Sequence, residues 1–289
     1  MLEATAGSIG ELIHGVRSIA DAWSPTPEPQ ELWFRGQRTG KWGLVPGLYR
    51  ADIEKLHYDE ISVLERFKVF ATPYVRRPPS NDWEWYFVAQ HHGLPTRLLD
   101  WSEGVLPAFY FALWELVYPK GRLSIDEDLL KPKGAPIFDD DSPVVWMLDA
   151  GTLNQAASGD DYPYVPGGEL TAKYLPENLA RAPSADNRAP LALLAPRADE
   201  RITAQQAVFT VHGHGKESLD ALALASEGGV PIRLAKIRLD RANICHLWTE
   251  LELAGVTKLA LFPSVDTAAE HVKWVMQAAK LTGSHESGD

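Results

Sequence analysis

WEWYFVAQHHGLPTRLLDWSEGVLPAFYFA, residues 83–112, is the segment of the chain with the densest chemistry. Apolar and aromatic residues occupy both of its ends. Its centre holds a run of polar or amphipathic residues: Gln90, His91, His92, Thr96, Arg97, Asp100 and Trp101. Because an unpaired buried polar group costs about 1–3 kcal/mol, a chain keeps such groups beside a core only when they are paired. The segment therefore predicts a polar site beside a hydrophobic core.

The pattern of this segment predicts a helix, a strand and a second helix. The first helix covers 83–92 and ends at Gly93, with Pro95 just beyond as a stop signal. The strand covers 97–101, and in an extended chain Arg97 and Asp100 then point to opposite faces. The second helix covers 104–118, and Asp100 is one candidate to cap its start.

Periodicity on either side of this segment extends the pattern over the whole chain. Helices are expected at 8–23, 58–71, 242–255 and 264–281, and strands at 32–37, 143–150, 191–196, 207–213, 231–239 and 257–263. We therefore expect one α+β domain over residues 1–282, with a mixed or antiparallel sheet flanked by helices. Polar, Pro-rich and Gly-rich sequence predicts a surface insertion at about 119–190, and residues 283–289 read as a disordered tail.

Composition narrows the classes of function. The formal net charge of −11 argues against general affinity for nucleic acid or for acidic membranes, which need a basic field. Cys245 is the one cysteine, so intramolecular disulfides and Cys-based zinc sites are excluded. No signal peptide and no apolar run of 18 residues is found, so we expect a cytoplasmic protein without a membrane partner.

Standard motifs of several enzyme classes do not occur. The chain has no GxGxxG after a strand, no GxxxxGK[ST], no GxSxG and no CxxC. The adjacent pair His91-His92 lacks the i,i+4 spacing of helical metal ligands, and no HExxH occurs, so no metal site is expected. Adjacent histidines on a helix also point in different directions, so at most one faces any pocket.

Three pieces of sequence together resemble the FRG domain, a bacterial and phage-associated family named for its Phe-Arg-Gly triplet. They are Trp33-Phe34-Arg35-Gly36-Gln37 with Trp42-x-Leu44-x-Pro46-x-Leu48-x-Arg50; Ala89-Gln90-His91-His92-Gly93-Leu94-Pro95-Thr96-Arg97-Leu98-Leu99-Asp100-Trp101 with Ala108-x2-Phe111-Ala112; and Arg201-x3-Gln205-Gln206-x2-Phe209 with Leu261-Phe262-Pro263. The resemblance is close over 30–115 and looser over 196–275.

A weaker similarity links the same pieces to ADP-ribosyltransferases, in which an early Arg or His anchors NAD and a late Glu assists cleavage. This similarity implies NAD as a substrate with no required cofactor, a protein or nucleic-acid acceptor, and a toxin or antiphage effector in bacterial or phage conflict. The chain departs from the pattern at the last element. Gln205 and Gln206 stand where the Glu is expected, and Glu200 is the nearest carboxylate.

The resemblance assigns expected roles to individual residues. Arg35 and Arg50 would hold a pyrophosphate, His91 or His92 a ribose, Trp101 or Phe209 the nicotinamide, and Gln205 the ribose or the acceptor. Asp100 or Glu200 would supply the carboxylate. Further nucleotide contacts are expected from Gln37, Gln90, Thr96 and Arg97.

Each of these residues also has a structural alternative. Arg35 can pair with Asp100, either histidine can cap a helix or pack in the core, and Trp101 can be an ordinary core residue. A nucleotide-sensing or protein-interaction module without catalysis is therefore the alternative function. A nuclease is a second alternative, although no carboxylate cluster for its metal is found in the sequence.

Overall fold

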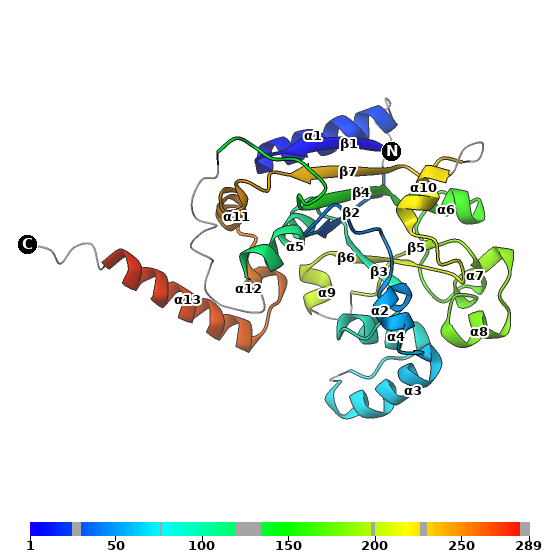
Figure 1. Ribbon diagram of the computed structural model, residues 1–289. Helices are drawn as coiled ribbons and strands as arrows, with labels where there is room; N and C mark the ends of the chain where they lie inside the picture. Colours follow the sequence, from blue (N-terminus) through cyan, green and yellow to red (C-terminus); the bar gives the residue numbers. More distant parts are fainter. Residues whose placement is uncertain (25–29, 76, 119–133, 198–199, 226–229, 284–289) are drawn as a thin grey trace, which may run out of the picture.

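The computed structural model describes residues 1–24, 30–75, 77–118, 134–197, 200–225 and 230–283. In this part of the chain seven strands form one sheet, in the order β1-β7-β4-β2-β3-β6-β5 (Figure 1). Their bounds are β1 Leu2–Ala6, β2 Leu32–Gln37, β3 Leu98–Ser102, β4 Val144–Asp149, β5 Leu191–Leu193, β6 Ala207–Val211 and β7 Leu234–Leu239. β1 runs parallel to β7 and the other neighbours are antiparallel. The expected α+β class with a mixed sheet is confirmed.

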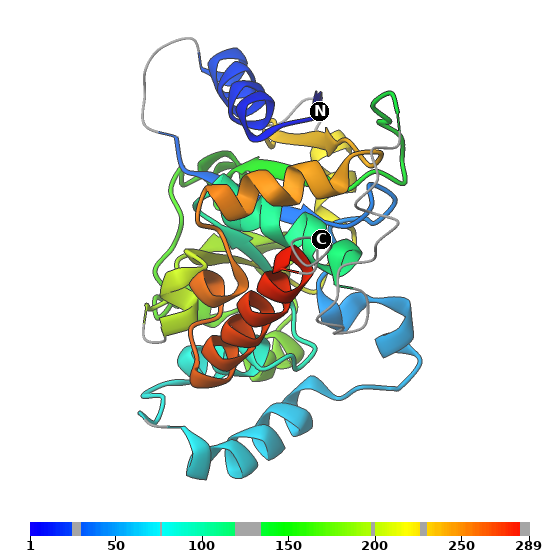
Figure 2. The ribbon, with the colours of Figure 1, turned by 90° about the vertical axis from the view of Figure 1, so that its left-hand side faces the viewer.

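Helices of very different length surround the sheet (Figures 1 and 2). They are α1 Ile9–Trp23, α2 Ala51–Glu54, α3 Glu60–Ala71, α4 Asp82–His91, α5 Val105–Val117, α6 Ala150–Ser158, α7 Glu169–Ala172, α8 Pro176–Arg181, α9 Glu200–Ala204, α10 Leu219–Ala225, α11 Ile244–Leu253, α12 Lys258–Leu261 and α13 Val265–Gly283, with 3-10 turns η1 Gly47–Tyr49, η2 Thr72–Tyr74 and η5 Ala185–Asn187. α13 extends away from the body of the molecule in Figure 1.

Alternation along the strands divides the apolar side chains between the two faces of the sheet. On one face, α1, α5 and α11 cover β2, β4 and β7, around Phe34 and Met147. On the same face, α3 and α4 cover β3, β5 and β6, around Leu98 and Phe209. A tryptophan-rich cluster that includes Trp101 packs on the opposite face. One face thus carries two separate cores with a gap between them.

The sheet is nearly split at this gap. β2 and β3 pair at a single position, Phe34 opposite Ser102, whereas β2 pairs with β4 over six residues. We call β1, β7, β4 and β2 the first half-sheet, and β3, β6 and β5 the second half-sheet. On the Leu98 side of Ser102, the backbone groups of β3 that face β2 have no hydrogen-bond partner in β2. Other groups must therefore form hydrogen bonds with them.

Gly36 allows α5 to lie directly on β2. A Cβ atom at Gly36 would lie 1.9 Å from the carbonyl oxygen of Ala108 and 2.5 Å from the amide nitrogen of Ala112. Both contacts are backbone atoms of a buried helix, so they cannot move aside locally. The glycine of the Phe-Arg-Gly triplet and the small residues of Ala108-x2-Phe111-Ala112 therefore belong to one packing arrangement.

Replacement of Gly36 by Ala is expected to lower the free energy of unfolding by about 3 kcal/mol, the upper end of the usual cost of overpacking. Urea denaturation followed by circular dichroism measures this change. Gly168→Ala is the matched control, because a Cβ there meets nothing within 4 Å. An unfolding midpoint for Gly36→Ala equal to that of the control would contradict the packing described for α5.

This fold differs from the expected one in several elements, among them the unexpected helices α6 and α10. Residues 257–263 were expected to form a strand, but Thr257 caps the short helix α12 by accepting a bond from the amide of Ala260. A short apolar run fits a buried helix as well as a strand, so periodicity alone could not decide. β1 was not expected. Within 155–190, α7, α8 and η5 pack inward and bury Tyr174 and Asn187. Residues 119–133 and 284–289 lie outside the described residues.

Candidate functional site

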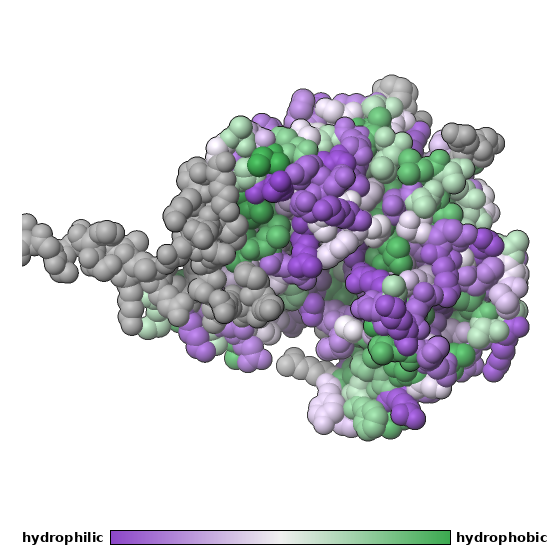
Figure 3. Space-filling view, in the orientation of Figure 1, coloured by the Kyte–Doolittle hydropathy of each residue, from purple (hydrophilic) through white to green (hydrophobic). Residues whose placement is uncertain are grey.

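A cavity of about 1100 Å³ opens where the two half-sheets separate. Figure 3 shows hydrophilic residues gathered near the centre of this face of the molecule. The residues around it come from β2 and the loop after it, η1, α2, α4, β3, α5, α9 and β6. They include Phe34, Arg35, Gln37, Arg38, Lys41, Trp42, Tyr49, Arg50, Asp52, Gln90, His91, Asp100, Trp101, Phe111, Glu115, Arg201, Gln205 and Phe209. The cavity thus joins all three pieces of sequence that carry the family resemblance.

Arg35 lies on β2 at the point where β3 turns away. Its Nη1 donates a 2.6 Å hydrogen bond to the carbonyl oxygen of Asp100, so the guanidinium replaces a missing ladder donor. The Asp100 carboxylate lies 3.8 Å from the same nitrogen. Arg35 Nε is buried and has no hydrogen-bond partner. A buried donor without a partner is costly, so this guanidinium is prepared to bind an acceptor that enters the cavity.

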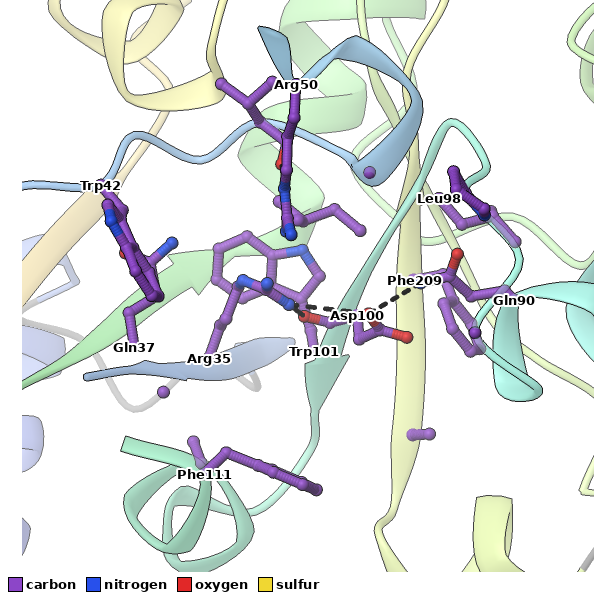
Figure 4. A pocket seen from close by; sticks show the side chains of 18 of the residues that line it. Arg35, Gln37, Trp42, Arg50, Gln90, Leu98, Asp100, Trp101, Phe111 and Phe209 are labelled. Carbon is purple, nitrogen blue, oxygen red and sulfur yellow. Dashed lines mark hydrogen bonds and ion pairs between the residues drawn. The ribbon is translucent and has the colours of Figure 1, made fainter. Parts of the chain in front are cut away.

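Arg50 points toward Arg35 across the cavity, and the indole of Trp101 is drawn close to both in Figure 4. The pKa of Arg35 is lowered to about 10: burial lowers it most, the Asp100 carboxylate partly counteracts this, and the positive charge of Arg50 contributes to the lowering. Among the described residues no carboxylate forms an ion pair with Arg50. An anion between the two guanidinium groups would relieve their repulsion.

The lining is more basic than the chain as a whole. Five lysine or arginine side chains line the cavity against three carboxylates, in a chain of net charge −11. The rim pairs two of the cations with carboxylates, Arg38 with Glu115 at 3.4 Å and Lys41 with Asp141 at 2.6 Å. Arg35 and Arg50 are therefore the cations best suited to bind a ligand anion.

A chain of hydrogen bonds orients the Asp100 side chain. Thr96 Oγ1 accepts from the amide of Leu98 and donates to Gln90 Oε1 over 2.6 Å. Gln90 Nε2 then donates to Asp100 Oδ2 over 2.8 Å. The Asp100 side chain is 53% exposed and lies beside Arg35 in the cavity. Side chains from the end of α4 and the start of β3 thus place one carboxylate beside the buried guanidinium.

The structure separates the two adjacent histidines. His91 lines the cavity, whereas His92 is the exposed C-cap residue of α4 and is not part of the lining. Thr96 is buried outside the lining and acts through Gln90. Of the expected ligand contacts on α4, His91 and Gln90 are the ones beside the cavity.

The remaining expected contacts line the cavity but are already engaged with the protein. Gln37 Oε1 accepts from Trp146 Nε1 at 2.8 Å, and Trp101 Nε1 donates to Thr210 at 3.1 Å. Gln205 Nε2 donates to the carbonyl oxygen of Leu261 at 3.1 Å. Phe209 is 3% exposed at the back of the cavity. These side chains present apolar surface or fixed polar atoms to the cavity.

Arg97 lies apart from the cavity, in a buried polar network. Its Nε donates to Glu60 Oε2 at 2.8 Å, and its Nη1 donates to the carbonyl oxygen of His212 at 2.8 Å. Its Nη2 donates to the carbonyl oxygen of Tyr174, and the Tyr86 hydroxyl donates to Glu60. Burial alone would lower the pKa of Arg97, but Tyr86 and Glu60 outweigh it and raise the pKa. All three nitrogens of this guanidinium donate to the protein. Arg97 therefore connects the segments of Glu60, Tyr174 and His212 and is not a ligand contact.

His212 lies next to this network and is fully buried. Burial, followed by the charges of Arg97 and Arg35, lowers the pKa of His212 from 6.5 to about 3. Neither ring nitrogen has a hydrogen-bond partner. The folded protein therefore holds this imidazole neutral over a pH range in which the unfolded chain protonates it.

Protonation of His212 in the unfolded chain is expected to make stability depend on pH. Between pH 6.5 and pH 3 the unfolded state binds one more proton than the folded state, so the free energy of unfolding falls as the pH falls. The contribution is about 1.4 kcal/mol per pH unit. Urea denaturation at several pH values from 6.5 to 4 should show a shallower slope for His212→Leu than for the parent. Parallel slopes would contradict a neutral His212.

Two further aromatic residues of the lining, Trp42 and Phe111, were not expected as site residues. Trp42 is 45% exposed, with the guanidinium of Arg38 4.7 Å from its ring centre. Phe111 lies half-buried on α5 and contacts Phe262. Both occur in the motif pieces, but an aromatic residue in a motif looks the same whether it packs in the core or lines a cavity. Both rings line the cavity that lies where the half-sheets separate, and this position depends on tertiary structure.

Within the described residues, no group of three His, Cys, Asp or Glu side chains could hold a metal ion. None of the described helices is long and apolar enough to cross a membrane.

Comparison with known proteins identifies one family. Residues 30–117 match the family model of the FRG domain. No curated protein and no solved structure matches the chain. The matched segment contributes Arg35, Arg50, Gln90 and Asp100 to the cavity, whereas Gln205 lies outside the match.

Proposed function

From an FRG domain over residues 30–117, we propose that the cavity binds a phosphate-bearing nucleotide of the NAD type and that the protein cleaves it as an ADP-ribosyltransferase-like enzyme. The observation that carries this proposal is the buried guanidinium of Arg35, whose Nε has no partner and which faces Arg50 and Asp100 in one cavity. Guanidinium groups bind phosphate oxygens with two parallel hydrogen bonds, which suits Arg35 to a pyrophosphate.

The size and lining of the cavity support a ligand of this kind. A volume of about 1100 Å³ exceeds that of most small-ligand pockets and accommodates a dinucleotide. The exposed indole of Trp42 offers a flat surface for a base, and Phe111 and Trp101 add apolar lining (Figure 4). Arg35 and Arg50 line the same cavity as these rings, so phosphate and base subsites would lie close together, as a dinucleotide requires.

Cleavage would break the bond between ribose C1′ and the nicotinamide nitrogen. The electron pair leaves with nicotinamide, and positive charge develops on the ribose. A carboxylate fixed beside the ribose stabilises that charge, and Asp100 is the described carboxylate held by both Arg35 and Gln90. Water, or a nucleophile on a protein or nucleic-acid acceptor, then attacks C1′ and loses a proton. NAD is the substrate in this scheme, and no further cofactor takes part.

Asp100→Asn is expected to lower the rate of nicotinamide release roughly 100-fold or more, because a neutral amide stabilises the developing charge poorly. Binding of NAD should weaken less than cleavage, since the backbone bond from Arg35 to residue 100, and with it the phosphate subsite, remains. Calorimetry measures binding, and chromatographic detection of nicotinamide measures cleavage. Asp21→Asn, at an exposed position on α1, is the control. Absence of NAD binding to the unmodified protein would remove the proposal.

A nucleotide sensor without catalysis is the second candidate. It is favoured by Gln205, whose side-chain amide is bound to the carbonyl oxygen of Leu261 where a late carboxylate was expected. A sensor would bind NAD or a related nucleotide in calorimetry and leave it intact after prolonged incubation. Release of nicotinamide that depends on Asp100 would decide for the enzyme.

The biological setting follows from the enzyme hypothesis. An enzyme that consumes NAD in the cytoplasm would stop growth of the producing cell, as a toxin or antiphage effector does. Induced expression should therefore arrest bacterial growth and deplete NAD, and Asp100→Asn should relieve both effects. Growth arrest without loss of NAD would point to a different activity.

A further inference from the structure

The Asp100 carboxylate, a hydrogen-bond acceptor, lies beside the N–H donors of Arg35 in the cavity. Its Oδ2 is held by Gln90, while the rest of the half-exposed carboxylate faces the cavity. Arg35 provides only N–H donors on one side of it. A ligand that satisfies both must carry acceptor oxygens for the guanidinium and, within one or two bonds of them, hydroxyl donors for the carboxylate.

The donors and acceptors of this arrangement are fixed by the chain itself. Thr96 Oγ1 accepts from the amide of Leu98, so its hydroxyl hydrogen points to Gln90 Oε1. With its oxygen so occupied, the Gln90 amide must turn its NH₂ group toward Asp100. The carboxylate is therefore held as an acceptor whose position does not depend on a ligand. Gln90 is a positioning residue in this arrangement.

We propose that Asp100 binds the vicinal hydroxyl groups of a ribose whose phosphate lies between Arg35 and Arg50, so the cavity selects ribonucleotides over 2′-deoxyribonucleotides. This inference rests on the proposed nucleotide function and specifies its substrate class. A sugar phosphate has the required chemistry, because its hydroxyl donors lie a few bonds from its phosphate acceptors. A 2′-phosphate in place of the hydroxyl would bring further negative charge to Asp100 and would be excluded.

Calorimetric titration with ADP-ribose and with its analogue that lacks the 2″-hydroxyl of the terminal ribose tests the selection, because both keep the ribose that Asp100 would bind and neither carries nicotinamide to be cleaved. We expect the 2″-deoxy analogue to bind the unmodified protein roughly 10- to 100-fold more weakly, the effect of one hydrogen bond to a charged group. Asp100→Ala should remove this difference by weakening ADP-ribose and not the 2″-deoxy analogue. It leaves the bond from Arg35 to the backbone of residue 100 in place, so the phosphate subsite is kept.

Gln90→Ala provides the test of positioning. It should reduce the ratio of the two affinities without abolishing it, because the carboxylate remains but is no longer held in one orientation. Gln155→Ala, at an exposed position on α6, is the matched control and should keep the full ratio. A ratio unchanged in Gln90→Ala would overturn the positioning role.

The outcomes separate this inference from the proposed function. Equal affinity of the unmodified protein for ADP-ribose and its 2″-deoxy analogue would overturn selection by Asp100 while leaving the phosphate subsite intact. A ratio that persists in Asp100→Ala would assign the selection to another group. No binding of ADP-ribose, its 2″-deoxy analogue or NAD would overturn the nucleotide function itself.

Discussion

Replacement of Glu60 by Ala is expected to lower the free energy of unfolding by about 3–5 kcal/mol, the usual result of removing one partner from a buried ion pair. Glu60 accepts from Arg97 Nε and from the Tyr86 hydroxyl, and its side chain is 14% exposed. Without it, the guanidinium of Arg97, which is 1% exposed, keeps its charge but loses its counter-ion. Urea denaturation monitored by tryptophan fluorescence measures the loss.

Glu65→Ala on the same helix is the matched control for Glu60→Ala. Glu65 is 55% exposed and contacts Lys68 at 2.7 Å, so its removal should cost less than about 1 kcal/mol. The double variant Glu60→Ala/Arg97→Met should lose less stability than the sum of the single changes, because the two residues share one interaction. Equal effects of Glu60→Ala and Glu65→Ala would contradict the buried network.

Replacement of Arg35 by Ala is expected to weaken binding of NAD and ADP at least roughly 100-fold, because it removes two charge-assisted hydrogen bonds to phosphate. Arg35→Lys should recover little of this loss. A lysine has a single ammonium group. It cannot donate to the carbonyl oxygen of Asp100 and also form two parallel hydrogen bonds to a phosphate, as a planar guanidinium can. Calorimetry measures the affinities, and circular dichroism checks that the fold is kept.

Two comparisons make the Arg35 result specific. Arg17→Ala removes an exposed positive charge on α1, where the side chain is 83% exposed, and should leave nucleotide affinity unchanged. Raising the salt concentration should weaken binding to the parent more than to Arg35→Ala, because fewer charges remain in the variant. Full nucleotide affinity in a folded Arg35→Ala protein would show that the phosphate binds elsewhere.

The sequence predicted those parts of the fold in which local pattern and final environment agree. α4 ends where Gly93 takes a φ of 83°, a left-handed conformation that suits glycine, and Asn81 caps its start. The strand carrying Arg35 and the strand carrying Asp100 were both expected, as was the α+β class. The FRG family was recognised from residue order alone, and the match over 30–117 confirms it.

Other parts depend on tertiary contacts that no local pattern encodes. Arg97 and Arg35 both occur beside apolar residues in the sequence, yet one is saturated by Glu60 and two carbonyl groups while the other keeps a free Nε. Arg35 lies where β3 pairs with β2 only at Ser102, whereas β3 pairs with β6 over its whole length. His212 could not be identified as a buried neutral group, since its burial comes from distant segments.

In the described residues, β2 and β3 pair at one register position, Phe34 opposite Ser102, so the boundary between the two half-sheets is short. On one face of the sheet each half-sheet has its own apolar cluster, whereas the tryptophan-rich cluster on the other face spans both. A ligand bound by Arg35 on β2 and by Asp100 on β3 would bridge this boundary. By linkage, such a ligand would stabilise the joined arrangement of the half-sheets, and the coupling free energy between binding and that arrangement is the same in both directions.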